Sequence, residues 1–409
     1  MLREAARDAG ADSGAEAAEA EAKREGVVDD GGSGAVSSAG GGALEVAGTA
    51  VALGESVDVS LPIAQSYSGA DVGVPVRVVR APEPGPTVFV TGVVHGDELN
   101  GAGIVREIML RPGFELLRGS LLLVPVVNIL GFERHSRYLP DRRDLNRSFP
   151  GGPSGSLASR LAHAVFTEVI ARSDFGIDLH TAALRRTNFP NVRGDLRVPG
   201  VRRIAEAFGC EIIINSRGQP KTLRRSACDA GVPTIILEAG TVWRVEPSVL
   251  EWGVRGIRNA LIELGMVAGE RAAPAFQAIV RRKTWVRARA GGFLEFHVGP
   301  GDLVDSGQPI ATCTSLRGER LDVLEAPMAG VVLGMTMLPA ATPGDPVCHL
   351  GAPEGGLRRI RKALRGVDED SLHARTQSAL GAAIAVTAPQ EADGGLGGPA
   401  EGGSTGRPA

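Results

Sequence analysis

The chain has 409 residues, which is enough for two or three domains of ordinary size. Its 44 Lys and Arg residues nearly balance 47 Asp and Glu residues, giving a net charge of -3. This balance argues against a general nucleic-acid binder, which usually carries a basic field. No apolar run reaches the about 18 residues that span a bilayer, and the N-terminus lacks the apolar stretch of a secretion signal. We therefore expect a cytoplasmic protein without a membrane segment.

The two ends of the chain differ in composition from the middle. Residues 1–47 and 366–409 are rich in Ala, Gly, Glu, Asp and Ser and poor in large apolar side chains. Such segments bury too little apolar surface to offset the conformational entropy that is lost when a chain becomes ordered. We therefore expect a disordered tail at each end, with the folded protein between them.

From residue 48 to about 270, predicted strands alternate with predicted helices. Apolar runs rich in β-branched residues predict the strands, and amphipathic periodicity with Pro or Gly stops predicts the helices. An alternating pattern of this kind is typical of an α/β fold, in which helices cover a sheet. The strands are expected at 74–79, 87–94, 121–127, 175–179 and 234–237, and the helices at 100–110, 157–171, 201–208 and 247–264.

Polar side chains repeatedly follow the ends of these predicted strands. His95, Asn128, His180 and Glu238 each come directly after a strand or close it. Open α/β sheets bind their ligands at the edge where the strands have their carboxyl ends. We therefore expect the functional site at this edge.

From about residue 275 to 352, the sequence changes to short strands and Gly or Pro turns. Residues 288–294 are echoed by residues 326–332, and the Gly-Asp turn at 301–302 is echoed at 344–345. Two similar halves predict a small pseudo-symmetric β-barrel domain, which resembles the barrel of biotinyl and lipoyl carrier domains. Those carriers attach their cofactor to a lysine, and no lysine lies between 284 and 361. We therefore expect a packing or lid module rather than a carrier.

His95 and Glu98 are spaced as partial metal ligands. A pair three residues apart on a turn or first helical turn points both side chains the same way. Imidazole and carboxylate groups suit Zn²⁺, and a catalytic zinc needs a third protein ligand and an open position. His180, at the end of another predicted strand, is the candidate third ligand. The alternative is a hydrogen-bonded pair with a structural role.

Four motifs occur together in a fixed order along the chain. They are HGDE at 95–98, a segment from 128 that ends in DLNRSFPG at 144–151, DLHTA at 178–182 and LEAG at 237–240. With these motifs the chain resembles the succinylglutamate desuccinylase/aspartoacylase family, a branch of the zinc carboxypeptidase fold, over about 48–352. The resemblance implies a mixed sheet layered by helices in a catalytic domain at 48–270, a barrel domain at 275–352 and one Zn²⁺ per chain.

The resemblance also implies roles for residues around the metal. His95, Glu98 and His180 match the zinc ligands of the family. Glu238 matches the general base that accepts a proton from the attacking water. Asp144 matches a carboxylate that orients the first zinc histidine, an arrangement that metal-binding histidines commonly need.

Further residues match the family's contacts with substrate. Arg137 matches the arginine that polarises the scissile carbonyl, and Asn146 and Arg147 match the pair that grips the substrate's carboxylate. Five residues separate Arg137-Tyr138 from Asp144, more than the aspartoacylases are expected to have, so Arg143 competes for the role of Arg137. Guanidinium groups suit both tasks, because they stabilise an oxyanion and bind carboxylates bidentately.

These observations together predict a zinc-dependent hydrolase that cleaves the amide of a small N-acylated amino acid. A metallocarboxypeptidase acting on short peptides is the alternative enzyme, and a non-catalytic metal- or metabolite-binding module is the alternative outside enzymes. Glu238 argues against the binding module, because a binder needs no base. The acyl group and any assembly into a homo-oligomer stay open. Candidate cations for extra substrate carboxylates are Arg185, Arg186, Arg193, Arg224 and Arg225.

Overall fold

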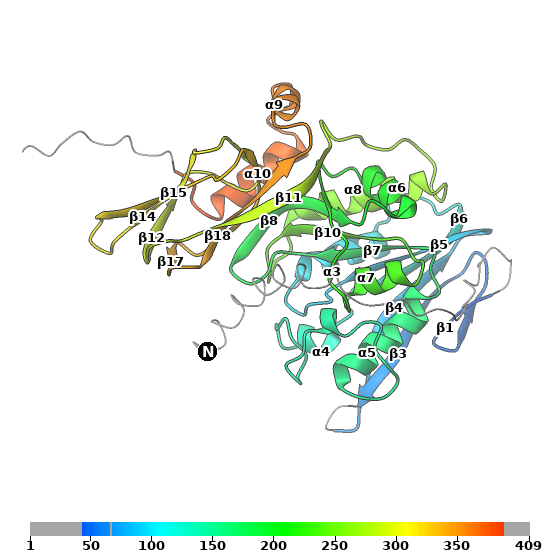
Figure 1. The fold of residues 1–409 in the computed structure, drawn as a ribbon. Helices are drawn as coiled ribbons and strands as arrows, with labels where there is room; N and C mark the ends of the chain where they lie inside the picture. The colour runs from blue at the N-terminus through cyan, green and yellow to red at the C-terminus, as the bar shows by residue number, and fades with distance from the viewer. Residues whose placement is uncertain (1–42, 66–67, 388–409) are drawn as a thin grey trace, which may run out of the picture.

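The computed structural model describes residues 43–65 and 68–387, and its centre is a twelve-stranded mixed sheet (Figure 1). The strand order is β13-β16-β18-β11-β9-β8-β10-β7-β5-β6-β4-β3. In chain order these strands are β3 Ser56–Gln65, β4 Asp71–Arg80, β5 Glu83–Gly92, β6 Arg118–Val124, β7 Phe175–His180, β8 Arg186–Gly194, β9 Ile212–Asn215, β10 Thr234–Gly240, β11 Ala278–Arg287, β13 Leu303–Val304, β16 Gly330–Thr336 and β18 Pro346–Pro353.

Helices pack on both faces of this sheet through two separate apolar cores. One core includes side chains of α3 (Leu99–Leu110), α6 (Pro199–Phe208) and α8 (Pro247–Glu263). The other includes side chains of α5 (Leu157–Val165) and α7 (Leu223–Asp229). The predicted mixed α/β class is therefore confirmed, and no helix of the described residues is long and apolar enough to cross a membrane.

Four neighbouring strands at the centre of the sheet run parallel: β6, β5, β7 and β10. Their carboxyl ends consequently lie at one edge of the sheet. The chain leaves β5 toward His95, ends β7 at His180 and carries Glu238 near the end of β10. This arrangement brings all four strand-end residues of the sequence analysis to the same edge, because Asn128 follows β6 and its backbone amide donates a hydrogen bond to the Val93 carbonyl.

The strands after residue 278 divide between two sheets. Strands β12 (Gly292–Phe296), β14 (Pro309–Thr314), β15 (Arg320–Glu325) and β17 (Ala340–Ala341) form a four-stranded sheet at one end of the molecule (Figure 1). Strands β11, β13, β16 and β18 instead continue the large sheet. A third apolar core, with side chains such as Leu294 and Leu350, lies between the two sheets.

Five strands of the large sheet close on themselves. β8 pairs with β9, β9 with β11, β11 with β18, β18 with β16, and β16 returns to β8. An apolar core that includes Phe189, Val280 and Leu333 belongs to this closed barrel, and helix α9 (Arg358–Leu364) packs on it through Ile360. The barrel therefore takes strands from both of the regions that the sequence analysis separated.

The structure corrects the prediction of a disordered C-terminal tail. We expected disorder from residue 366, but α10 (Leu372–Ala382) buries Leu372, Thr376 and Leu380. The Trp252 indole donates a hydrogen bond to Thr376 at 3.0 Å. Average composition hides this helix, because a few buried side chains at a spacing of four suffice when α8 offers a packing surface.

The predicted start of the folded region at residue 48 is also too late. Strand β1 (Leu44–Val46) pairs with β2 (Thr49–Val51), so the predicted boundary at residue 47 falls inside a hairpin. The predicted disorder of residues 1–42 and 388–409 lies outside the described residues.

Candidate metal centre

A sharp bend after β5 carries His95 and Glu98 to the edge of the sheet. Val93 has φ of 55°, which is unusual for a β-branched residue, and its carbonyl accepts a hydrogen bond from the Asn128 amide at 2.9 Å. The Glu98 amide donates to the His95 carbonyl at 3.2 Å and thereby closes a turn just before α3. Uncommon backbone conformations of this kind concentrate at functional sites, where surrounding contacts hold them.

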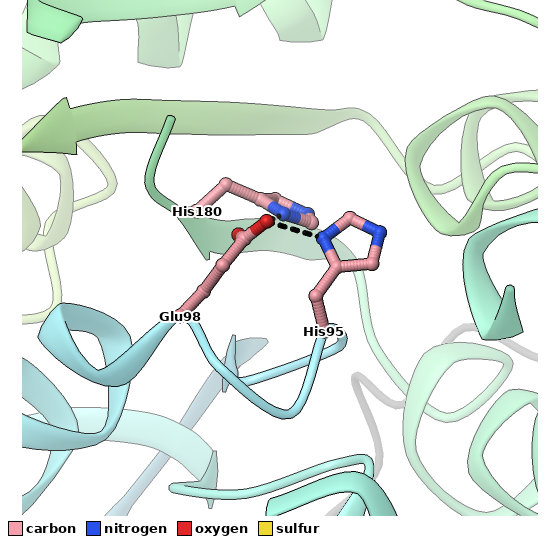
Figure 2. Close-up of side chains that lie close together, drawn as sticks. All are labelled: His95, Glu98 and His180. Atoms are coloured by element: carbon pink, nitrogen blue, oxygen red, sulfur yellow. Dashed lines mark hydrogen bonds and ion pairs between the residues drawn. The ribbon is translucent and has the colours of Figure 1, made fainter. Parts of the chain in front are cut away.

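Three predicted ligands converge in the structure. His95, Glu98 and His180 are 4 %, 1 % and 4 % exposed, and one potential ligand atom from each lies within 4.8 Å of the others. The Glu98 carboxylate lies between the two rings, 2.6 Å from Nδ1 of His95 and 2.9 Å from Nδ1 of His180. Figure 2 shows the three side chains pointing toward one another, with His95 and Glu98 from one loop and His180 from a strand end.

The outward nitrogens of both rings face carboxylates. Nε2 of His180 lies 2.8 Å from Asp178, whose other oxygen accepts a hydrogen bond from Thr91 at 2.8 Å. Nε2 of His95 lies 3.4 Å from Asp144. A carboxylate on the second nitrogen fixes the orientation of a metal-binding imidazole and raises its basicity. Both rings therefore present Nδ1 to the centre of the cluster.

The electrostatics of the cluster favour a cation. Burial and Arg137 lower the pKa of His95, but Glu98 and Asp144 together outweigh them and the pKa is raised. Burial opposes protonation of His180 as well, yet Asp178 and Glu98 hold its pKa well above the usual value. The two histidines in turn lower the pKa of Glu98 against its burial. A divalent metal would meet the same demand for positive charge between these groups.

Arg137 lies beside the cluster and Arg143 does not contact it. The Arg137 guanidinium is 3.3 Å from Glu98 and 3.2 Å from Asp144, and these carboxylates raise its pKa despite burial. Arg143 is 59 % exposed at its side chain and lies 3.9 Å from Asp141. The positive charge nearest the candidate ligands is therefore that of Arg137.

Glu238 lies on the strand next to His180. The two residues are in register between the parallel strands β10 and β7, so their side chains project from the same face of the sheet. The Glu238 carboxylate accepts a hydrogen bond from Asn188 at 3.1 Å and pairs with Arg193 at 3.3 Å. These contacts hold a carboxylate at the same sheet edge as the candidate metal ligands.

The turn that ends β10 requires a glycine at position 240. Gly240 has φ of 72°, and a Cβ there would lie 1.9 Å from the Glu246 carboxylate. That carboxylate accepts hydrogen bonds from the Thr241 amide at 2.9 Å and from Asn100 at 2.8 Å. The turn therefore ties the end of β10 to α3, the helix that follows Glu98.

Asn146 and Arg147 lie in a short 3-10 turn, η1 (Leu145–Arg147), after Asp144. The Asn146 side-chain oxygen accepts a hydrogen bond from the Leu223 amide at 2.8 Å, which anchors the turn to α7. Burial opposes ionisation of Asp144, but hydrogen bonding to His95 and the charges of Arg137 and Arg147 lower its pKa. The Arg147 guanidinium donates a hydrogen bond to the Asn146 carbonyl at 2.7 Å and so folds back on the turn that follows Asp144.

The donor set fits a zinc ion. The residues present are two imidazoles and a carboxylate, all buried, which is a ligand set found at catalytic zinc sites. Sequence reasoning gave no role to Asp178 or Asn188. Asp178 had a signal, because it precedes His180 by two residues in a strand and so faces the same way. Asn188 had none, because its contact depends on strand pairing.

The comparisons with known proteins agree on one family. The succinylglutamate desuccinylase/aspartoacylase catalytic domain matches residues 84–264. The N-alpha-acetyl-L-2,4-diaminobutyric acid deacetylase of Halomonas elongata is 31 % identical over 268 residues, which cover 62 % of this chain and 78 % of the relative. The chain therefore belongs to the succinylglutamate desuccinylase/aspartoacylase family, as its four motifs predicted.

Solved structures agree on the fold. A succinylglutamate desuccinylase/aspartoacylase from Rhodobacter sphaeroides is 27 % identical with a TM-score of 0.63, over 73 % of this chain and 95 % of that one. The product-bound ectoine utilization protein EutE (DoeB) from Ruegeria pomeroyi is 23 % identical with a TM-score of 0.64, over 72 % and 95 %. The similarity thus extends over nearly the full length of each of the two solved structures and over almost three quarters of this chain.

Proposed function

We propose that this protein is a zinc-dependent hydrolase that cleaves the amide bond of a small N-acylated amino acid. The products would be a carboxylic acid and a free amine. The observation that carries the proposal is the convergence of His95, Glu98 and His180 beside Glu238 at one sheet edge. The relative from Halomonas elongata, named as a deacetylase of an N-acetylated amino acid, supports the reaction class.

We assign His95, Glu98 and His180 as the ligands of one zinc per chain. Their Nδ1 atoms and carboxylate face a common centre, and Asp178 and Asp144 face the outer nitrogens of the rings. A bound zinc supplies a water whose pKa falls to about 7 and a positive charge for the scissile carbonyl.

Glu238 is the proposed general base. It accepts a proton from the attacking water and delivers it to the leaving amine, which cannot depart as an anion. Asn188 and Arg193 hold its carboxylate in place. Its position in register with His180 supports the assignment.

Arg137, Asn146 and Arg147 are the proposed contacts with substrate. Arg137 polarises the scissile carbonyl, and its contact with Glu98 supports this role over Arg143, which is largely exposed. Asn146 and Arg147 grip the carboxylate of the amino acid, for which a guanidinium is suited. Both residues lie in the turn directly after Asp144, whose carboxylate is 3.4 Å from Nε2 of His95, and this supports a place near the metal.

We further propose a carboxypeptidase-like catalytic domain at 48–270 and a biotinyl- or lipoyl-like barrel domain at 275–352. A domain at 275–352 beside the candidate metal centre would narrow the mouth of the site, which favours a small substrate over a peptide. Met337 lies after β16, and its sulfur accepts a hydrogen bond from Thr241 at 3.2 Å, just beyond β10. This contact between the two regions supports the role of a wall.

Metal analysis combined with a substrate panel tests the proposal. We expect about one zinc per purified chain and hydrolysis of N-acyl amino acids. His180→Ala should lose both, whereas His163→Ala on α5, away from the cluster, should keep both. Normal zinc content in His180→Ala would contradict the site. Turnover of dipeptides alone would favour a metallocarboxypeptidase, and zinc without any turnover would favour a binding module.

A further inference from the structure

A cavity of about 560 Å³ lies beside helix α9, which is at the top of the view in Figure 1. Its lining includes Asp305, which follows β13, and Ala329, which precedes β16. None of its lining residues belongs to the candidate metal centre or to the proposed contacts with substrate. The other polar residues that line it are all basic and come from one short segment: Arg358, Arg361, Lys362 and Arg365.

The four basic side chains share one face of the helix. They stand at positions i, i+3, i+4 and i+7, the spacing at which side chains of an α-helix are neighbours. Arg359, in the same helix, does not line the cavity. Seven residues of α-helix rise about 10 Å, so the four charges form a row of roughly that length and not a single point.

This row carries more positive charge than its surroundings neutralise. Asp305 accepts a hydrogen bond from Arg361 at 2.8 Å and is the one carboxylate among the residues that line the cavity. Arg358, Lys362 and Arg365 are exposed. In the part of the chain that the structure describes, no carboxylate lies within ion-pair distance of these three side chains. They are therefore available to an anionic ligand.

Helix α9 carries these cations at a cost to its own stability. It begins after Leu357, which provides no side-chain cap, and its first turn has no acidic residue. Arg358 and Arg359 in that turn oppose the helix dipole, and like charges four residues apart repel one another. Burial of Leu357 and Ile360 in the core of the closed barrel holds the helix in place. When local preferences are broken on an exposed face, a functional site is the expected reason.

We propose that Arg358, Arg361, Lys362 and Arg365, here called the α9 cleft, bind a small ligand that carries a chain of two or more phosphate groups. Guanidinium groups match phosphate oxygens with paired hydrogen bonds, and three of the four cations are arginines. A row of charges about 10 Å long fits a chain of anionic groups better than a single one. The lining has no aromatic ring to stack a base, so the phosphate chain is the part that is recognised.

The surroundings of the α9 cleft argue against a long polyanion as the ligand. Nucleic acids bind to basic fields that extend along their backbone, whereas this chain has a net charge of -3. The carboxylate of Asp305 also interrupts the basic lining. A cavity of this volume is in the range of sites that enclose small ligands.

Calorimetry with inorganic tripolyphosphate tests the α9 cleft on the full-length protein. In about 0.15 M salt, where charges are screened over about 8 Å, we expect saturable binding at a single site. Arg358→Gln should weaken it by about 10- to 100-fold, the range for hydrogen bonds to charged groups. Arg359→Gln removes the same charge from the same helix but lies outside the cleft, so it is the matched control and should bind as the wild type.

A second variant and a second measurement guard against a folding defect. Glutamine favours helix about as well as arginine does, so we expect Arg358→Gln to stay folded. Arg365→Gln lies just after the last residue of α9 and should weaken binding without altering the helix interior. Tripolyphosphate should raise the Tm of the wild type and of Arg359→Gln, and should raise the Tm of the two cleft variants less.

Nucleotides identify the source of the phosphates. ATP that binds as tightly as tripolyphosphate would assign recognition to the phosphate chain alone, and tighter binding of ATP would assign it to a nucleoside polyphosphate. AMP, with a single phosphate, should bind more weakly than either by about 10-fold or more.

Three results would overturn the α9 cleft, and none of them depends on hydrolysis of an N-acyl amino acid. The first is the absence of saturable binding of both tripolyphosphate and ATP. The second is an equal loss of binding in Arg358→Gln and Arg359→Gln, which would indicate general attraction to a basic surface. The third is an oligothymidylate that binds more tightly than tripolyphosphate and depends on Arg359, which would indicate a nucleic-acid surface instead.

Discussion

His180 and His349 are both buried histidines on strands of the same large sheet, yet their charge states are driven in opposite directions. His180 is 4 % exposed and has a pKa well above the usual value, because Asp178 and Glu98 outweigh the effect of burial. His349 is 7 % exposed and has a pKa well below it, because burial acts together with three cationic side chains.

The difference shows that residue type and burial do not decide what a histidine does. Carboxylates around His180 favour a positive charge on or beside its ring, whereas burial and the cations around His349 favour its neutral form. Each neighbourhood lies on one side of Glu238, the proposed base.

Removing the central carboxylate of the acidic neighbourhood should have the largest effect. Glu98→Ala leaves two histidines without the group between them, so we expect zinc content and turnover to fall to background. Elemental analysis and an N-acyl amino acid assay measure this, with circular dichroism to establish folding. Glu107→Ala, on the surface of α3, should change neither. A folded Glu98→Ala protein with full zinc would contradict the ligand assignment.

Neutralising the proposed base should affect chemistry without affecting the metal. Glu238→Gln keeps the shape of the side chain and removes its ability to accept a proton. We expect kcat to fall by about 10²-fold or more while zinc content stays unchanged. Single-turnover kinetics on the zinc-loaded variant would locate the loss in the chemical step. Full turnover in Glu238→Gln would mean that another group accepts the proton.

Weakening the support of His180 should have a smaller effect. Asp178→Asn keeps a hydrogen-bonding side chain at 2.8 Å from Nε2 but removes its charge. We expect zinc affinity to fall by about 10- to 100-fold, as for other partners of metal-binding histidines. Competition with a chelator measures this. Asp58→Asn, an exposed residue paired with Arg77, is the control, and equal affinities in the two variants would exclude the supporting role.

The cationic neighbourhood predicts a modest dependence of stability on pH. The pKa of His349 in the folded state lies below the about 6.5 of an unfolded chain. As pH falls below that value, the unfolded state binds a proton that the native state excludes. The free energy of unfolding should therefore decrease by at most about 1.4 kcal/mol per pH unit from this residue.

Urea denaturation at pH 7.5, 6.5 and 5.5 would measure this dependence. His349→Gln should show a shallower loss of stability on acidification than the wild type, because it has no group to protonate. His163→Gln, on α5, should keep the wild-type slope. An unchanged slope in His349→Gln would show that His349 takes up a proton in the folded protein as readily as in the unfolded chain, and would contradict the lowered pKa.

The sequence predicted the acidic neighbourhood much better than the cationic one, for a physical reason. His95 and Glu98 are three residues apart, so local geometry orients them, and His180 follows at the end of another predicted strand. Asp178, two residues before His180, had the same local signal but was given no role. The α/β class followed from strands and helices that alternate along the chain, each with its own periodicity.

The cationic neighbourhood depends on contacts between distant segments. Arg186 reaches Trp285 across about one hundred residues of chain, and His349 lies 64 residues beyond Trp285. No local pattern reports such pairing, because it follows from the register of β11, β18 and β16. Helix α10 was missed for a related reason, since its stability comes from α8 and not from its own composition.

The closed barrel has a consequence for how this protein can be divided or recombined. A fragment that stopped at residue 270 would retain β8 and β9 but lose β11 and β16, the strands on either side of them in the barrel. Unpaired backbone groups and the side chain of Phe189 would then face water, which invites pairing with other chains. The strands before residue 270 and those after residue 278 therefore form one structural unit. Exchanging the C-terminal part between relatives requires exchanging its partner strands β8 and β9 as well.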